Sequence, residues 1–346
     1  MKAFIAKEPG VTEFIEVEKP KLGPKDILAK VSYAGVCATD IALITGETTF
    51  VTEGLAKYPI RIGHEWSGIV TEVGEDVKTI KPGDHVIGEN GVPCFDCPTC
   101  WSGNSAHCPN ARSVGTLNTY DGCFAEYMKM PERLTYKLGD DTDLDEAALI
   151  EPASIAMAGI IKSGVKFGDM VMVIGTGPIG LTGVGLLKAI GCSVILVGRR
   201  DSKLEIGRQM GADYLLNSAT QDIAEELKKI TVTGRVNTII ESSGNVQMFK
   251  DCANYISGGG NVVLLGFFEK PIDDFNIDKF VVNDVNLLGV AGTGGSMPGI
   301  IELLKYKRVS FKPLISSVYN FNDAQEAVDH VIQNDGDRIK VLLKFD

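Results

Sequence analysis

The sequence predicts an α/β protein of about two domains, and three observations support that fold class. The chain has 346 residues, more than one typical domain. Residues 1 to about 150 form short β-rich segments between turns, whereas strands and helices alternate from about residue 155. Hydrophobic residues make up 44% of the chain and charged residues 23%, which is sufficient for ordinary hydrophobic cores.

The N-terminal part is predicted to be a β domain. Its strand candidates are residues 27–37, 67–74 and 84–89, all rich in valine and isoleucine. The turns "KLGPKD" and "KPGDH" separate them, because glycine and proline end regular strands.

The second part is predicted to be a doubly wound parallel sheet. Short Val/Ile/Leu strands alternate with helical segments, a pattern typical of sheets covered by helices on both faces. The expected strands are 168–175, 192–198, 236–244 and 260–266. The expected helices are 177–191, which follows the first strand, and 201–212, which follows the second. A further helix, 298–307, and a strand, 338–345, follow in a tail that we expect to return to the first domain.

Charge and hydropathy exclude some classes of function. The net charge of −11 disfavours a protein that binds nucleic-acid backbones. The N-terminus lacks the apolar core of a signal peptide, and no apolar run approaches the ~18 residues of a membrane span. We therefore expect a cytoplasmic protein without membrane or nucleic-acid partners.

Four of the eight cysteines lie in one loop, at Cys94, Cys97, Cys100 and Cys108. Clustered cysteines in a reducing compartment are more often metal ligands than disulfides. Four thiolates complete the tetrahedral coordination of Zn²⁺ and leave no position for substrate, so we predict a structural zinc. Free or disulfide-bonded cysteines and an iron–sulfur cluster are the alternatives.

A second set of metal ligands is spread along the chain. The segments "GVCATD", "IGHEWSG" and "LIEPAS" supply Cys37, His64, Glu65 and Glu151. Sulfur, nitrogen and oxygen ligands of this kind occur at catalytic zinc, which keeps one position open. Each residue alone is weak evidence, because single cysteines are usually buried and Glu-Pro pairs often only end an element.

A glycine-rich turn predicts a dinucleotide site. Gly175-x-Gly177-x-x-Gly180 follows an apolar strand and opens a helix, and Pro178 and Ile179 lie within the motif. The glycines allow a tight turn, approach of the pyrophosphate and close packing of helix on strand. The helix N-terminus then faces the phosphates.

The end of the next strand favours NADP(H) over NAD(H). NAD enzymes usually place a carboxylate there, whereas this strand ends in Gly198, Arg199 and Arg200. Glycine leaves room for a 2′-phosphate, and guanidinium groups can bind it. Alternatively, both arginines are solvated charges and Asp201 serves NAD.

These motifs together resemble the zinc-dependent medium-chain dehydrogenases, in particular the polyol (sorbitol-like) and sugar-alcohol-phosphate branch. The resemblance spans the whole chain and rests on "GVCATD", "GHEWSGIVTEVGEDV", "KPGDHV", the four-cysteine loop, "DGCFAEY", "EPAS" and "GTGPIGL" in the order of that family. It implies a GroES-like catalytic domain (1–152, with the zinc loop 94–108), a Rossmann domain (153–288), and a segment (289–346) that completes the first.

The resemblance also implies roles for individual residues. Cys37, His64 and Glu65 would bind the catalytic zinc, with Glu151 as a further ligand bound directly or through water. Thr39 would take the proton of the substrate, Asp40 would orient His64, and the catalytic residues would be Thr39, Glu65 and Glu151. The active site would lie in a cleft between the domains. Ala42 and Gly292 depart from the family, since they replace a relay histidine and an arginine that contacts polyol.

The resulting hypothesis is a zinc-dependent oxidoreductase that converts a secondary hydroxyl of a polyol or sugar-alcohol phosphate to a ketone with NADP⁺. It would have one catalytic and one structural zinc, and would form a homo-oligomer of two or four chains. A threonine-type dehydrogenase and a non-catalytic NADPH-binding protein are the alternatives.

Overall fold

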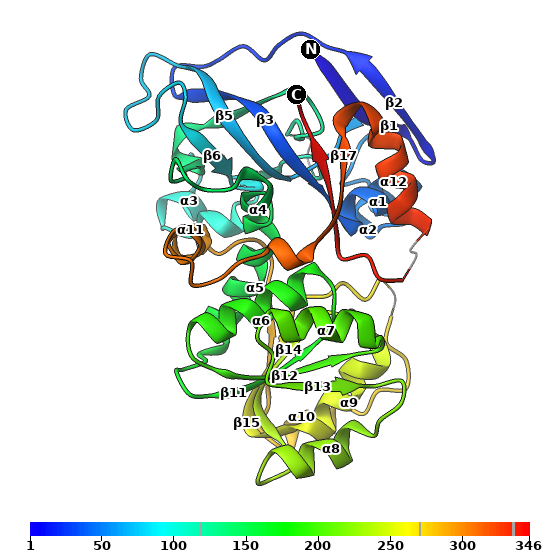
Figure 1. Cartoon of the computed structure of the whole chain (residues 1–346). Helices are drawn as coiled ribbons and strands as arrows, with labels where there is room; N and C mark the ends of the chain where they lie inside the picture. The colour runs from blue at the N-terminus through cyan, green and yellow to red at the C-terminus, as the bar shows by residue number, and fades with distance from the viewer. Residues whose placement is uncertain (118–119, 270, 334–335) are drawn as a thin grey trace. The chain divides into compact units, whose positions relative to one another are not determined.

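The computed structural model describes residues 1–117, 120–269, 271–333 and 336–346 (Figure 1). The chain folds into two compact units. The first consists of Met1–Glu151 and Ile315–Asp346, and the second consists of Pro152–Leu314. The boundary predicted from the sequence differs from this division at the C-terminal end. The sequence predicts that the chain returns to the first unit at residue 289, whereas it does so at Ile315. Residues 290–314 instead belong to the second unit, because Ser296 Oγ donates to the Ser154 carbonyl at 2.9 Å and the Val309 side chain lies against Gly185.

The first unit is built on a mainly antiparallel seven-stranded sheet that combines both ends of the chain. Its strands, in spatial order, are β10 (Thr135–Lys137), β6 (His85–Gly88), β5 (Glu65–Val73), β3 (Asp26–Val36), β18 (Lys340–Lys344) and β17 (Ile315–Asn320), with β9 (Tyr127–Pro131) also on β3. A three-stranded sheet, β2 (Val11–Glu16), β1 (Lys2–Glu8) and β4 (Ile60–Arg61), and the pair β7 (Gly91–Val92) and β8 (Arg112–Ser113) complete the β structure of the unit.

Short helices connect these strands. They are α1 (Ala38–Thr45), α2 (Thr49–Thr52), α3 (Pro98–Trp101), α4 (Leu144–Ala147) and α12 (Ala324–Gln333), with 3₁₀ turns at Ser105–His107, Glu132–Leu134 and Phe321–Asp323. Trp66, Phe4, Phe124 and Ile27 are fully buried in the core between the sheets. Burial of such side chains supplies most of the stability of a β domain.

The second unit is the predicted doubly wound sheet. Its six strands are all parallel, in the order β13 (Tyr214–Asn217), β12 (Ser193–Gly198), β11 (Met170–Ile174), β14 (Val236–Glu241), β15 (Ile256–Leu264) and β16 (Asn286–Gly289). The chain enters the sheet at β11, the strand before the glycine motif, and continues outward to β12 and β13. It then returns to β14 on the other side of β11, as in dinucleotide-binding sheets.

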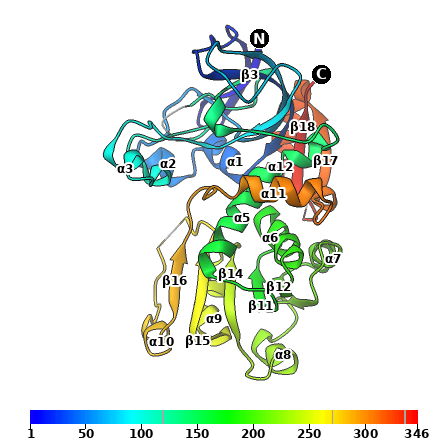
Figure 2. The same ribbon diagram turned by 90° about the vertical axis from the view of Figure 1, so that its left-hand side faces the viewer.

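Helices cover both faces of this sheet. In Figures 1 and 2, α6 (Pro178–Ala189) and α7 (Asp201–Gln209) lie on one face, whereas α8 (Ile223–Ile230) and α9 (Val246–Tyr255) lie on the other. The remaining helices are α5 (Ile150–Ser163), α10 (Asp278–Val281), α11 (Met297–Lys305) and a 3₁₀ turn at Lys312–Leu314. Because both faces are covered, strand residues such as Val171 and Met172 are fully buried on opposite sides. The α/β fold class predicted from the sequence is confirmed.

Candidate active site

Cys37, His64 and Glu65 converge at one point of the first unit. Strands β3 and β5 are antiparallel neighbours with Gly35 opposite Glu65, so the residues that follow β3 and precede β5 meet. One ligand atom of each of the three side chains lies within 4.8 Å of the other two, and His64 and Glu65 are buried. A Cβ at Gly35 would lie 2.1 Å from Glu65 Oε2, so glycine leaves the space that this carboxylate occupies.

Asp40 holds the backbone around this group. Its carboxylate is fully buried and accepts from Cys37 N at 2.8 Å and from Gly63 N at 3.1 Å. The same carboxylate lies 3.4 Å from His64 Nδ1. Burial lowers the pKa of His64, but Asp40 and Cys37 outweigh it and hold that pKa well above its usual value. The predicted contact of Asp40 with His64 is therefore present, and metal binding here would displace a proton.

Lys340 is a member of this site that the sequence reasoning missed. Its Nζ lies 2.8 Å from Oε1 and 2.7 Å from Oε2 of Glu65, and both side chains are buried. Strand β18 carries Lys340 next to β3, opposite the strand that bears Glu65. Each carboxylate oxygen has two lone pairs, so the ion pair leaves Glu65 with capacity for a metal.

Glu151 and Thr39 lie at the edge of the group. The Glu151 carboxylate, in the first turn of α5, accepts from Asn90 Nδ2 and is not among the three converging ligand atoms. Burial raises the pKa of Glu151 to about 7. The neighbouring His64 lowers this pKa and the Glu65 carboxylate raises it, but burial has the largest effect. The Thr39 hydroxyl lies 3.8 Å from Cys37 Sγ. Both residues are therefore near the cluster, with Glu151 outside its innermost set.

This donor set fits a zinc ion. One thiolate, one imidazole and one carboxylate are the ligand types that zinc takes, and three protein ligands leave a position for another molecule. Burial of His64 and Glu65 would keep the site in a low-dielectric surrounding.

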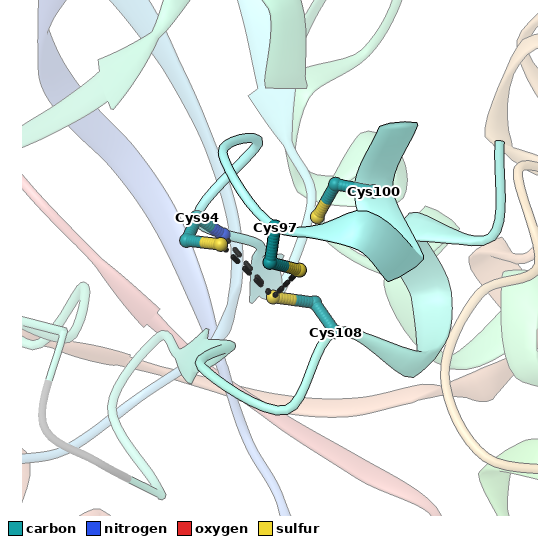
Figure 3. A group of neighbouring side chains, drawn as sticks. All are labelled: Cys94, Cys97, Cys100 and Cys108. Carbon is teal, nitrogen blue, oxygen red and sulfur yellow. Dashed lines mark hydrogen bonds between the residues drawn. The ribbon is translucent and has the colours of Figure 1, made fainter. Parts of the chain in front are cut away.

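The four loop cysteines also converge, as Figure 3 shows. Cys108 Sγ lies 3.4 Å from Cys94 Sγ and 3.9 Å from Cys97 Sγ, and the four ligand atoms are mutually within 4.8 Å. A disulfide requires about 2.05 Å, so these sulfurs are not bonded to each other. Tetrahedral zinc with sulfurs at about 2.3 Å sets them about 3.8 Å apart, which the observed spacing fits. Such spacing leaves room for one ion rather than for a cluster of irons and sulfides.

The glycine motif of the second unit joins β11 to α6. Gly175 has φ 115°, a left-handed conformation that favours glycine, and a Cβ at Gly180 would lie 2.1 Å from the Gly175 carbonyl oxygen. A Cβ at Gly177 would meet nothing within 4 Å, which leaves open space where α6 begins at Pro178 and continues with Ile179. Tight packing at the outer glycines and space at the middle one fit a pyrophosphate.

A cavity of about 320 Å³ opens beside this turn. It is lined by residues from the ends of β11, β12, β13 and β14, namely Ile174, Gly175, Thr176, Val197, Gly198, Arg199, Arg200, Ser218, Ala219, Ser243, Asn245 and Met248. Gly198 must be small, since a Cβ there would lie 2.5 Å from Thr176 Cγ2. Asp201 does not line the cavity.

Glu241 is a second residue that the sequence reasoning missed. Its buried carboxylate accepts from Ser243 N at 2.9 Å, from the Ser243 hydroxyl, and from Gly244 N at 3.2 Å. Burial raises the pKa of Glu241, and these hydrogen bonds only partly offset the effect. The carboxylate thus orders the turn that carries Ser243 into the cavity wall.

Two family models match the chain. The alcohol dehydrogenase GroES-like domain matches residues 23–140, and the zinc-binding dehydrogenase model matches residues 178–306. Among relatives, the D-xylulose reductase of Saccharomyces cerevisiae is 30% identical over 99% of this chain and 97% of its own length. The chain belongs to the zinc-dependent medium-chain alcohol dehydrogenase family, on its polyol dehydrogenase-like branch, and is an enzyme of that family.

Further comparisons show how widely substrates vary among similar proteins. A D-arabitol-phosphate dehydrogenase of Enterococcus avium is 28% identical over 99% of this chain and 97% of its own. An L-threonine 3-dehydrogenase of Caldanaerobacter subterraneus is 30% identical over 96% and 94%. A zinc-binding dehydrogenase of Sinorhizobium meliloti, solved bound to NADP, superposes with a TM-score of 0.90 at 28% identity, covering 99% and 98% of the two chains.

Helices in the described part of the chain are too short or too polar to cross a bilayer.

Proposed function

We propose that this enzyme reversibly oxidises a secondary hydroxyl of a polyol or sugar-alcohol phosphate to a ketone, with NADP⁺ as hydride acceptor. The observation that carries the proposal is the convergence of Cys37, His64 and Glu65 within 4.8 Å at a largely buried site. A zinc ion held by these residues supplies a Lewis acid that lowers the pKa of a substrate hydroxyl.

The side chains around this group have separate tasks. Cys37, His64 and Glu65 hold the metal, and Asp40 and Lys340 fix the positions of His64 and Glu65 through the contacts described above. Thr39 relays the proton of the substrate, because its hydroxyl oxygen accepts that proton while its own hydroxyl proton is passed on. Glu151, with its pKa raised to about 7 by burial, is the further acidic ligand or holds a water beside the metal.

Three features support NADP(H) over NAD(H). Arg199 and Arg200 line the cavity at the end of β12, where they can bind a 2′-phosphate. Gly198, which ends β12, carries no carboxylate that would repel a 2′-phosphate. The Sinorhizobium meliloti relative was solved with NADP.

The substrate class is supported by two relatives, one named a reductase of the ketose D-xylulose and the other a dehydrogenase of the polyol phosphate D-arabitol phosphate. A glutamate at position 151 fits both this branch and the threonine dehydrogenases, one of which is 30% identical. Threonine therefore remains the second candidate substrate.

We further propose that the loop cysteines hold a structural zinc and that the enzyme is a homo-oligomer. Strand β16 is last in the sheet order, and Leu287 on it is exposed together with Val281 and Val282 nearby. An apolar sheet edge is suited to pairing with a second copy. Light scattering during gel filtration tests this, and a monomeric mass contradicts it.

A substrate panel tests the central proposal. Polyols, their phosphates and L-threonine are each offered with NADP⁺ and NAD⁺, and reduced nicotinamide is followed by absorbance. We expect a polyol or polyol phosphate with NADP⁺ to give the highest kcat/KM, and Cys37→Ser to abolish it. Preference for threonine supports the second candidate, and no turnover of any substrate contradicts both.

A further inference from the structure

The proposed NADP⁺ pocket has a carboxylate close to it in the chain. Asp201 follows Arg200 directly and begins α7, the helix after β12. A carboxylate beside a 2′-phosphate repels it, and one beside Arg199 and Arg200 competes for them. The structure must therefore keep Asp201 away from the phosphate if the cofactor is NADP⁺, and the inference below rests on that proposed preference.

Asn217 makes the contact that does this. Its Nδ2 donates to Asp201 Oδ1 at 2.7 Å. Asn217 ends β13 and lies in register with Gly198 of β12, three residues before the start of α7. Neither Asp201 nor Asn217 lines the cavity, although their neighbours Arg200 and Ser218 do.

The orientation of the Asn217 amide is set by a second hydrogen bond. Its Oδ1 accepts from Ala219 N at 2.9 Å, which directs the NH₂ group toward Asp201. Its backbone N–H donates to Gln221 Oε1 at 2.6 Å, and the residue is only 7% exposed. An amide satisfies both neighbours at once, because it accepts from one and donates to the other.

We propose that Asn217 is a specificity-determining positioning residue for the cofactor. It binds the Asp201 carboxylate outside the cavity, so that this carboxylate does not compete with a 2′-phosphate at the end of β12. Loss of this hydrogen bond releases a negative charge near the phosphate, which weakens NADP(H) and leaves NAD(H) unaffected, since NAD(H) has no phosphate at that position.

Binding of NADPH and NADH, measured by nicotinamide fluorescence, tests the proposal without substrate or turnover. Asn217→Ala is expected to raise the Kd of NADPH about tenfold and to change that of NADH less than about twofold. Asp201→Asn alone is expected to have little effect. The double variant Asn217→Ala with Asp201→Asn is expected to regain the wild-type Kd of NADPH, because no carboxylate is left to release.

A second pair of variants preserves the shape of the site. Asn217→Asp still accepts from Ala219 but faces Asp201 with a like charge, so it is expected to weaken NADPH. Adding Asp201→Asn restores the hydrogen bond with donor and acceptor exchanged, and is expected to restore binding. This pair answers the question if Asn217→Ala does not fold.

Different results would refute the role of Asn217 and the preference for NADP(H). Equal losses for NADPH and NADH, without rescue by Asp201→Asn, would show a purely structural role and overturn the inference. A wild-type enzyme that binds NADH as tightly as NADPH overturns the cofactor preference itself.

Discussion

Among single residues, Glu65 and Lys340 form a buried ion pair that matters for stability. Both side chains are almost fully buried, and Lys340 Nζ contacts both carboxylate oxygens. Burial lowers the pKa of Lys340, but Glu65 and the nearby Cys37 outweigh it, and the pKa stays above its usual value. Lys340 therefore remains protonated, and removal of its partner leaves a buried charge uncompensated.

We predict that Lys340→Met lowers the free energy of unfolding of the metal-free enzyme by about 3 kcal/mol or more, because Glu65 loses its partner. The loss is expected to be smaller with zinc bound, since the metal then neutralises Glu65. Urea unfolding with and without zinc measures both values. Lys344→Met, on the same strand but exposed, is the control and should change little. An equal loss in both variants would show that the ion pair has no special role.

The sequence could not have indicated Lys340. In "RIKVLLKF" nothing local distinguishes Lys340 from Lys344, and the pattern predicts only a strand. The role of Lys340 depends on β18 pairing with β3, a contact between distant parts of the chain. Cys37, His64 and Glu65 were predictable because each belongs to a motif of the family, although their convergence also depends on strand pairing.

At the scale of elements, the turn between β11 and α6 shows how glycine allows a strand and a helix to approach. Gly180 and Gly183 both lie in α6, but their surroundings differ. A Cβ at Gly180 would lie 2.1 Å from the Gly175 carbonyl oxygen, whereas one at Gly183 would meet Ala156 Cβ at an ordinary 3.6 Å. Only the first glycine is required for packing.

We predict that Gly180→Ala displaces the start of α6 and weakens NADPH at least tenfold, because the methyl group cannot fit against backbone. Gly183→Ala is the matched control. It should leave binding unchanged and raise the free energy of unfolding by up to about 1 kcal/mol, since alanine restricts the unfolded chain. Fluorescence titration measures NADPH binding by the two variants, and urea unfolding measures their stability. Unchanged NADPH binding in Gly180→Ala would refute the role assigned to the turn.

Element positions in the second unit were largely predictable, and their side-chain arrangements were not. The glycine motif and the Val/Ile/Leu strands identify β11, α6 and β12 because these signals are local. That Asp201 is bound by Asn217 follows only from β13 lying beside β12, and the sequence alone left Asp201 as a candidate NAD ligand.

At the scale of the whole molecule, the chain builds its first unit from both ends. β17 and β18 join the sheet of the N-terminal residues, and β18 pairs directly with β3. The sequence did not indicate that the chain returns to the first unit only at Ile315. The reason is that α11 has a buried apolar face, formed by Met297, Ile300 and Ile301, and such a face can pack against either unit. Its actual partners are set by tertiary contacts such as that of Ser296 with Ser154.

We propose that one chain holds two zinc ions of different kinds, and elemental analysis of protein purified without added zinc tests this proposal. We predict about two zincs per chain in the wild type and about one in both Cys37→Ser and Cys97→Ser. Cys37→Ser should keep its circular dichroism and lose turnover, whereas Cys97→Ser should unfold at lower urea. A folded wild-type protein without zinc, or a Cys37→Ser variant that keeps both ions and full activity, would refute the proposed pair of zinc sites.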